Sequence, residues 1–503
     1  MDMTHTGADS SKEERDQRVN DVVARILARS GTALASTTGQ DTSQDAGALE
    51  REARAGTRRV DTGASDREDI SEVEYRQVRL EKVVLVGLRT TQSEEEAENS
   101  LRELAALAET AGSRVLDGII QRRMKPDPAT YLGSGKAREL ADIVRSVEAD
   151  TVIVDEELAP SQRRGLEDVV DAKVVDRTAL ILDIFAQHAK SREGKAQVEL
   201  AQLEYLLPRL RGWGESMSRQ AGGRVAGGAG IGSRGPGETK IELDRRRIRT
   251  RMAKLRADIA RMEPARRTQR NSRRRGAVPS VAIAGYTNAG KSTLLNRLTD
   301  AGVLVEDALF ATLDPTVRRA RTADGREYTL TDTVGFVRNL PTQLVEAFRS
   351  TLEEVGAADV LLHVVDAAHP DPVSQVEAVR AVLSGIEGAD RVPELIALNK
   401  ADLATPEQLA VLRTAFPGSV ALSAKTGYGV GTLRAALEDL LPRPSVLIDV
   451  VIPYSAGSLV HRVHEEGEVE REEYAAEGTR LVARVDEALA AAVRAATAPR
   501  ADE

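Results

Sequence analysis

The 503-residue sequence predicts a multidomain α/β protein. We expect a small N-terminal α/β domain, a long antiparallel helical stalk, a doubly wound parallel sheet of the P-loop type and a small C-terminal α/β domain. Two observations favour this class. Strand-like apolar runs alternate with helical patterns in three parts of the chain, and two long helical patterns with narrow apolar stripes separate the first part from the second. Such alternation is typical of sheets covered by helices.

The composition limits the class of protein. Hydrophobic residues make up 41% of the chain but aromatic residues only 3%, so the cores must be aliphatic. No run approaches the roughly 20 apolar residues of a membrane span, and the polar N-terminus lacks the apolar core of a secretory signal. The absence of cysteine excludes disulfides and thiolate metal sites. We therefore expect a cytoplasmic protein with no membrane span.

Residues 1–75 are rich in Ser, Thr, Gly, Asp and Arg, and we expect them to form a disordered extension. One stretch, RDQRVNDVVARILARS, differs because its apolar residues fall at helical spacing. These are Val19, Val22, Val23, Ile26 and Leu27. Two interpretations remain open: a fraying helix with no partner, or a helix that docks on another surface.

The N-terminal α/β domain is predicted over residues 76–188, from strand-like runs such as VRLEKVVLVGL and TVIVD and the helical pattern ARELADIVRSVEA. Within it, Gly133-Ser134-Gly135-Lys136 resembles a phosphate loop. It lacks the first glycine at the required spacing, and Ala137 stands where a magnesium-binding hydroxyl is needed. We therefore predict the start of a helix here.

The stalk is predicted over residues 189–275. Its two helical patterns are about 22 residues each, or roughly 33 Å of helix, and their narrow stripes suit antiparallel pairing. Their glycine-dense connection carries Trp213, and loops of its length are usually either functional or disordered. From Arg245 to Arg275 there are 14 Lys and Arg against 2 acidic residues, a strongly basic block in a chain of net charge −9. Such a block calls for a partner.

Strands and helices alternate again over residues 276–443, with a hairpin turning at Asp324-Gly325, and this pattern predicts a doubly wound parallel sheet with one antiparallel edge. The remainder, residues 444–503, suggests a small α/β unit that ends in an alanine-rich helix.

A phosphate loop is the strongest motif. GYTNAGKST places Gly285, Gly290, Lys291 and Ser292 in the G-x-x-x-x-G-K-[ST] pattern, directly after an apolar strand and before a helix. Backbone N–H groups of such a loop wrap phosphates, the lysine reaches the β- and γ-oxygens, and the hydroxyl binds magnesium.

Three further motifs follow in the chain order of a guanine-nucleotide switch. Asp332 ends an apolar strand, where its carboxylate can hold the magnesium hydration shell, and Gly335 can donate its N–H to the γ-phosphate. In LNKADL, Asp402 can accept two hydrogen bonds from guanine, while Asn399 and Lys400 brace the loop and cover the base. In SAKTG, the Ala424 N–H can reach guanine O6.

A hydroxyl that senses the γ-phosphate must lie between the phosphate loop and Asp332. FATLDPT offers Thr312 and Thr316; we favour Thr312 as the magnesium ligand and Thr316 as a structural turn residue. The residues expected to bind nucleotide are Gly285, Tyr286, Thr287, Asn288, Ala289, Gly290, Lys291, Ser292, Thr293, Phe310, Ala311, Thr312, Leu313, Asp314, Asp332, Thr333, Val334, Gly335, Asn399, Lys400, Ala401, Asp402, Ser423, Ala424 and Lys425. Lys291, Thr312 and Gly335 are the expected catalytic groups.

With these motifs in place, the chain resembles the HflX family of ribosome-associated GTPases over about residues 76–490. The carrying motifs are GYTNAGKS, FATLDPT, DTVGF and NKAD, together with RGPGETKIELDRR at Arg234–Arg246. The resemblance implies a GTPase with Mg²⁺ as cofactor, monomeric when free. It also implies binding to the large ribosomal subunit and its RNA, with splitting or recycling of stalled ribosomes under stress. The expected RNA-binding residues are Arg224, Arg234, Lys240, Arg245, Arg246 and Arg249.

Phe336 follows the Asp332–Gly335 motif, where many GTPases place a glutamine that orients the attacking water. A phenyl ring cannot orient water, so we expect a slow intrinsic rate that the ribosome stimulates. Alternatively, Phe336 only packs, in a switch that binds GTP without cleaving it. At the level of the whole protein, the alternatives are a GTP-dependent protein-interaction switch and a ribosome-assembly GTPase without splitting activity.

Overall fold

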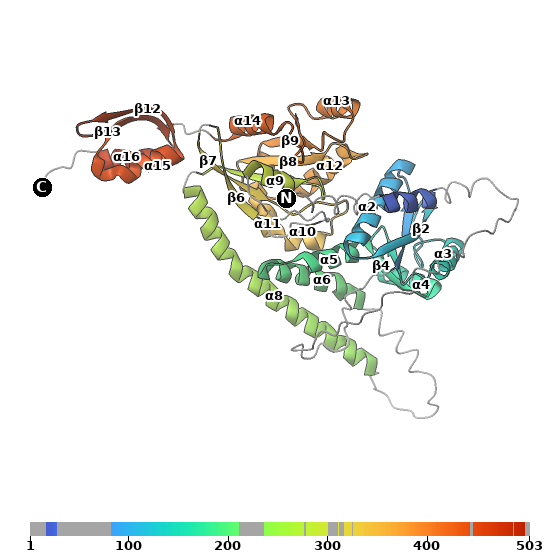
Figure 1. The fold of residues 1–503 in the computed structure, drawn as a ribbon. Coiled ribbons are helices and arrows are strands. Elements are labelled where there is room, and N and C mark those ends of the chain that lie inside the picture. Colours follow the sequence, from blue (N-terminus) through green and yellow to red (C-terminus); the bar gives the residue numbers. More distant parts are fainter. Residues whose placement is uncertain are drawn as a thin grey trace, which may run out of the picture. The chain divides into compact units, whose positions relative to one another are not determined.

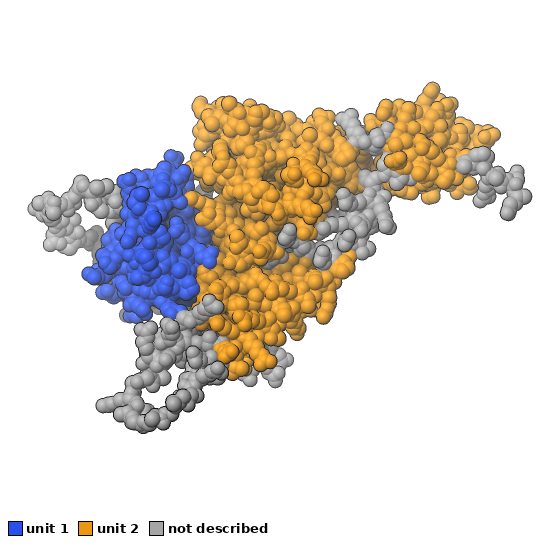
Figure 2. All heavy atoms as spheres, turned by 180° about the vertical axis from the view of Figure 1, so that it is seen from behind, with its two compact units in different colours: residues 1–177 blue, residues 178–503 orange. Residues whose placement is uncertain are grey.

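The computed structural model describes residues 17–27, 82–210, 236–275, 278–299, 310, 316–323, 325–442, 446–485 and 487–497. The chain forms two compact units, residues 1–177 and residues 178–503 (Figure 2). We predicted that the first domain ends at residue 188, whereas the first unit ends at residue 177. Helix α5 (Arg177–His188) therefore belongs almost entirely to the second unit.

The first unit is built on a four-stranded parallel sheet of order β2-β1-β3-β4. Its strands are almost continuously apolar, as expected for a sheet covered on both faces. The strands are β1 (Lys82–Arg89), β2 (Arg114–Arg122), β3 (Thr151–Val154) and β4 (Lys173–Asp176), and the helices are α2 (Glu94–Thr110), α3 (Ser134–Ser146) and α4 (Pro160–Val170).

Local signals set the helix starts of this unit. Ser93 caps α2 because its hydroxyl accepts a hydrogen bond from the Glu96 N–H at 3.1 Å, while the Glu96 carboxylate accepts from the Ser93 N–H at 2.9 Å. The glycine-rich stretch before α3 is a helix start, as predicted: Gly133 is the N-cap, and Lys136 in the first turn pairs with Glu139 at 2.9 Å.

Residues 17–27 form a helix packed within the first unit. Val22, Val23 and Ile26 are at most 2% exposed. The Ile26 side chain lies over Gly118 in β2, where an added Cβ would meet Ile26 Cδ1 at 2.5 Å. The expectation that the whole extension is disordered is therefore wrong for these residues, and the docking interpretation is confirmed. Burial of four aliphatic side chains outweighs the polar composition around them.

The second unit begins with three helices: α5 (Arg177–His188), α6 (Arg192–Arg209) and α8 (Pro236–Arg275). With 40 residues, α8 is longer than predicted and spans about 60 Å. A seam of aliphatic residues joins α6 to α8. It contains Ala196, Leu200, Leu203 and Leu207 of α6 and Ile248, Met252, Leu255 and Ile259 of α8.

The direction of this helix pair corrects a prediction. Arg251 donates two hydrogen bonds to Glu199, at 2.6 and 2.8 Å, and Arg256 donates to Glu204 at 2.7 Å. Both ion pairs join residues 52 positions apart, and moving along α6 moves the contact forward along α8. An antiparallel pair would move it backward, so α6 and α8 run in the same direction. The stripes are compatible with either direction, which is why the antiparallel prediction was wrong.

The central sheet of the second unit has the order β10-β9-β8-β5-β7-β6. All its neighbours are parallel except the edge strand β6, which pairs antiparallel with β7, as predicted. The strands are β5 (Ser280–Gly285), β6 (Thr316–Arg321), β7 (Glu327–Asp332), β8 (Val360–Asp366), β9 (Glu394–Asn399) and β10 (Val420–Ala421). Thr316 begins β6 opposite Asp332, in keeping with a structural role.

Helices cover both faces of this sheet (Figure 1). On one face, α9 and α14 pack leucine and valine side chains against β5, β7, β8 and β9, and on the other, α12 and α13 pack against β8 and β9. This is a doubly wound sheet. The helices are α9 (Lys291–Thr299), α10 (Thr342–Ala347), α11 (Arg349–Gly356), α12 (Pro372–Leu383), α13 (Pro406–Ala415) and α14 (Val430–Leu440).

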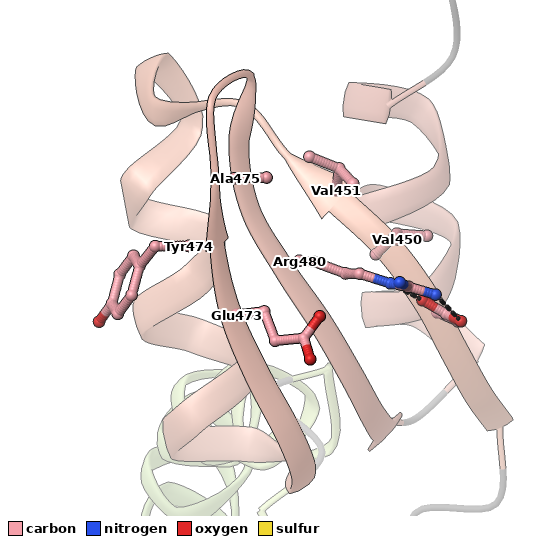
Figure 3. A pocket seen from close by; sticks show the side chains of 7 residues that line it. Val450, Val451, Glu473, Tyr474, Ala475 and Arg480 are labelled. Carbon is pink, nitrogen blue, oxygen red and sulfur yellow. Dashed lines mark hydrogen bonds and ion pairs between the residues drawn. The ribbon is translucent and has the colours of Figure 1, made fainter.

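The C-terminal part is a three-stranded antiparallel sheet of order β11-β13-β12, with α15 and α16 packed on one face. Its other face is open and carries ion pairs such as Arg480–Asp449 at 2.9 Å (Figure 3). A hollow of about 500 Å³ on this face is lined by Val451, Glu473 and Tyr474, among others. The elements are β11 (Val446–Ile452), α15 (Gly457–Glu466), β12 (Glu468–Ala475), β13 (Gly478–Val485) and α16 (Glu487–Thr497).

Candidate functional site

The four motifs lie at the carboxyl ends of strands of the six-stranded sheet. Strand β5 lies between β7 on one side and β8 on the other. The strand order therefore reverses at the carboxyl end of β5. Ligands of open α/β sheets bind at such points. The phosphate loop follows β5, Asp332 ends β7, and Asn399 ends β9.

Gly290 is required by the shape of the phosphate loop. Its φ is +91°, and an added Cβ would meet Asn399 Nδ2 at 2.3 Å. Asn399 in turn donates to the Ala289 carbonyl at 2.7 Å and accepts from the Ala424 N–H at 2.9 Å. Asn399 therefore ties the phosphate loop to the 423–427 loop.

Lys291 is the first residue of α9 and is 7% exposed. Its ammonium donates to the Tyr286 carbonyl at 2.9 Å, which holds it inside the phosphate loop. Burial lowers the pKa of Lys291 to about 8, against the opposing attraction of Asp332. A phosphate in the loop would place a negative charge beside this buried ammonium and so stabilise its charged form.

Ser292 and Asp332, the residues predicted to hold magnesium, lie in contact with each other. The Ser292 hydroxyl donates to Asp332 Oδ2 at 2.8 Å, and Asp332 is 1% exposed. Among the described residues no group of three His, Cys, Asp or Glu could hold a metal ion. One hydroxyl and one carboxylate fit Mg²⁺, which binds few protein ligands and takes the rest of its shell from phosphates and water.

Phe336 is joined to the phosphate loop through its main chain. Its N–H donates to the Gly285 carbonyl at 3.2 Å, and its carbonyl accepts from the Thr287 N–H at 2.8 Å. Its ring is 1% exposed. Neighbouring Gly335 lies close to Lys291, because an added Cβ would meet the ammonium at 3.1 Å. The ring of Phe336 is thus a buried core side chain, and it cannot orient the attacking water.

The base-recognition loops are partly engaged with each other. Lys400, with a φ of +59°, pairs with Asp366 at 2.6 Å. The Ala424 N–H, predicted to reach guanine O6, instead donates to Asn399. Asp402 lies in the turn after β9 and is exposed. In this arrangement the Asp402 carboxylate is exposed and accessible to a ligand. The Ala424 N–H would have to give up its hydrogen bond to Asn399 before it could donate to a guanine.

Phe310 lies in an aromatic cluster. Its ring centroid is 4.5 Å from the ring centroid of Phe185 in α5. The Phe185 ring centroid lies 5.3 Å from the ring centroid of Phe348. Phe310 is 2% exposed, so its ring is enclosed in this cluster. The predicted residues Ala311, Thr312, Leu313 and Asp314 lie outside the described residues.

Sequence reasoning missed two groups at this site. Asp366 holds Lys400, and Arg297 donates to the carbonyls of Ala424 and Lys425 at 3.1 and 2.6 Å. Arg297 is 127 residues from Ala424 in the chain. No local pattern links residues so distant, and only the packing of α9 beside the 423–427 loop brings them together.

The low pKa of Lys291 makes nucleotide affinity depend on pH. A bound phosphate favours the charged amine and raises its pKa, so binding takes up a proton once the pH exceeds about 8. We expect nucleoside diphosphate affinity to fall above that pH, by at most tenfold per unit. Calorimetry in buffers of different ionisation enthalpy measures this uptake. Arginine at position 291 should remove it, since guanidinium does not titrate there; equal uptake in both proteins would contradict the assignment.

Comparisons with known proteins agree with this geometry. Family profiles described as "GTP-binding GTPase N-terminal", "GTP-binding GTPase Middle Region" and "50S ribosome-binding GTPase" match residues 98–186, 188–273 and 280–400. The protein "GTPase HflX" of Lacrimispora saccharolytica is 45% identical over 79% of this chain and 92% of its own length.

A second relative gives the same picture. "GTPase HflX" of Escherichia coli K12 is 44% identical over 78% of this chain and 90% of its own length. A crystal structure of a GTP-binding protein from the archaeon Sulfolobus solfataricus in complex with GDP is 25% identical, with a TM-score of 0.38, and covers 72% of this chain and 98% of that one. The identity to bacterial relatives over nearly their full length, together with the four motifs around one sheet edge, shows that this chain is a GTPase and belongs to the HflX family.

Proposed function

We propose that this GTPase binds the large ribosomal subunit through the RNA-facing side of α8 and splits or recycles stalled ribosomes under stress. The match of residues 280–400 to the family of 50S ribosome-binding GTPases supports the choice of partner. We also propose that the protein is cytoplasmic, partly ribosome-associated, and monomeric when free. No described helix is long and apolar enough to cross a bilayer.

The observation that carries the proposal is the distribution of arginine on α8. Arg251 and Arg256 pair with acidic residues of α6. Arg246 and Arg249 are exposed, and within the described part of the chain no ion pair involves them. Arginines that are not engaged in holding the helix pair together can neutralise RNA phosphates. Of the other predicted RNA contacts, Arg224 and Arg234 lie outside the described residues, as does the side chain of Lys240.

For hydrolysis we propose that Lys291 neutralises the β- and γ-phosphate oxygens and that the Gly335 N–H donates to the γ-phosphate. Ser292 and Thr312 would hold Mg²⁺, with Asp332 accepting a hydrogen bond from its water shell. When bound, the ion would neutralise part of the negative charge of the phosphates. Because the Phe336 ring is buried, the attacking water must be placed by other groups, and we expect slow intrinsic hydrolysis stimulated by the ribosome.

A pelleting experiment tests the partner. The purified protein is mixed separately with small and large ribosomal subunits, with GDP or with a non-hydrolysable GTP analogue. We expect co-sedimentation with the large subunit, strengthened by the GTP analogue. Splitting is then measured by light scattering of intact ribosomes with GTP. Binding without splitting would favour the assembly role, and no binding to either subunit would favour the protein-interaction switch.

Replacing Arg245, Arg246 and Arg249 by Gln should weaken large-subunit binding and flatten its salt dependence. Each lost phosphate contact removes about 0.7–0.9 from the slope of log affinity against log salt, so three contacts remove about 2–3. The slope is measured by sedimentation over a series of KCl concentrations.

Arg251→Gln and Arg256→Gln form the matched control, since these arginines pair with α6. They remove the same kind of charge from the same helix, and we expect them to leave the slope near its original value. An unchanged slope in the triple variant would reject the RNA-facing role of α8.

A further inference from the structure

We propose that Arg297 is a positioning residue for guanine recognition, and that it acts by fixing the peptide planes of the 423–427 loop. This inference rests on the nucleotide roles proposed above and adds a residue outside all four motifs. Arg297 lies on α9, the helix that begins with the phosphate-binding lysine.

The contact is a two-pronged clamp. Arg297 Nε donates to the Ala424 carbonyl at 3.1 Å, and Arg297 Nη2 donates to the Lys425 carbonyl at 2.6 Å. The guanidinium holds its donors in a rigid planar fork, so two bonds to successive carbonyls fix two peptide planes at once. Hydrogen bonds from a charged donor are also stronger than neutral ones.

The clamp orients the amides of the loop as well as its carbonyls. In a trans peptide the carbonyl and the next N–H point in opposite directions. With the Ala424 carbonyl turned to Arg297, the Lys425 N–H is turned away from α9. The Ala424 N–H is directed at Asn399, at 2.9 Å. Both amides of this short stretch are therefore aimed by contacts made outside the loop.

The clamp also connects the two ends of the nucleotide. At its start α9 carries Lys291 in the phosphate loop, and fewer than two turns later it carries Arg297 against the base-recognition loop. Arg434 of α14 supports this turn, since it donates to the carbonyls of Arg297 and Leu298 at 3.3 Å each. A single rigid helix thus sets the spacing between phosphate recognition and guanine recognition.

The test uses Arg297→Met, which keeps most of the side-chain length and removes the donors. Arg297 is exposed, so this change opens no cavity in the core. Dissociation constants are measured for GDP, IDP and ADP in the full chain. IDP keeps the O6 of guanine but lacks its 2-amino group, whereas ADP lacks O6.

We expect GDP and IDP affinity to fall by the same factor, about tenfold, which corresponds to the loss of one charge-assisted hydrogen bond. ADP affinity should change little, so the preference for GDP over ADP falls about tenfold while the ratio of IDP to GDP stays constant. Arg297→Lys should restore part of the loss, since an ammonium can reach one carbonyl but cannot fork. Arg413→Met, at an exposed position of α13, is the matched control and should leave all three constants unchanged.

Two outcomes would overturn the inference: unchanged GDP affinity in Arg297→Met, or an equal loss for GDP, IDP and ADP, which would mean that Arg297 acts on the phosphate end or on the whole domain. Failure of the nucleotide roles themselves is distinguishable, because the unsubstituted protein would then show no preference for GDP over ADP.

Discussion

Lys291→Ala is expected to lower GTP hydrolysis by at least about 10²–10³-fold, the typical cost of removing one preorganised charge-stabilising group from a reacting centre. Lys291 is buried at the start of α9, and its ammonium already points into the phosphate loop, where it donates to the Tyr286 carbonyl. Single-turnover hydrolysis at saturating GTP measures the chemical step apart from binding.

Arg413→Ala serves as the control for this variant, because Arg413 is an exposed cation of the same domain on α13. We expect it to hydrolyse GTP at the parent rate. Thermal unfolding of both variants shows whether the domain remains folded. If a folded Lys291→Ala protein hydrolysed GTP at a rate near that of the parent, the phosphate loop would not be the catalytic site.

Asp402→Asn is expected to exchange guanine selectivity for xanthine selectivity. The Asp402 carboxylate can accept hydrogen bonds from guanine N1–H and the 2-amino group, whereas an amide leaves part of this edge unmatched. A site built to hydrogen-bond its substrate loses about 10⁴-fold or more when a partner is unpaired in full burial. Because Asp402 is exposed, we expect a smaller loss of GTP affinity, about 10²-fold, with tighter binding of xanthosine triphosphate.

Competition between labelled GDP and unlabelled nucleotides measures both affinities. Asp390→Asn, an exposed aspartate of the same domain, makes the same chemical change elsewhere and should alter neither. If Asp402→Asn kept the parent ratio of GTP to xanthosine triphosphate binding, base recognition would have to be reassigned to other residues.

Much of the nucleotide site was readable from the chain, because each motif is a short local pattern tied to a strand end. The glycines, Lys291 and Ser292 follow β5 within a few residues, and Asp332 and Asn399 each end a strand. Strand ends of a doubly wound sheet converge at the point where the strand order reverses, so local patterns were sufficient to place these groups near one another.

Three points were decided by contacts between residues far apart in the chain. The direction of α8 relative to α6 was wrong because an apolar stripe looks alike in either direction, and only the Glu199–Arg251 and Glu204–Arg256 pairs distinguish the two. For residues 17–27 a fraying helix and a docked helix were both open, and the packing of Ile26 over Gly118, more than 90 residues away, decides for the docked helix. The Ala424 N–H was assigned to guanine, but it donates to Asn399.

The identity of the motifs, their order and the sheet that carries them follow from the amino-acid sequence, because backbone conformation and hydrophobic periodicity act over a few residues. The clamp of Arg297 on the 423–427 loop, the burial of the Phe336 ring and the parallel course of α6 and α8 do not. Each of these depends on which of many compatible surfaces meet once the chain is packed, and that choice is made by the summed burial and pairing of residues far apart in the chain.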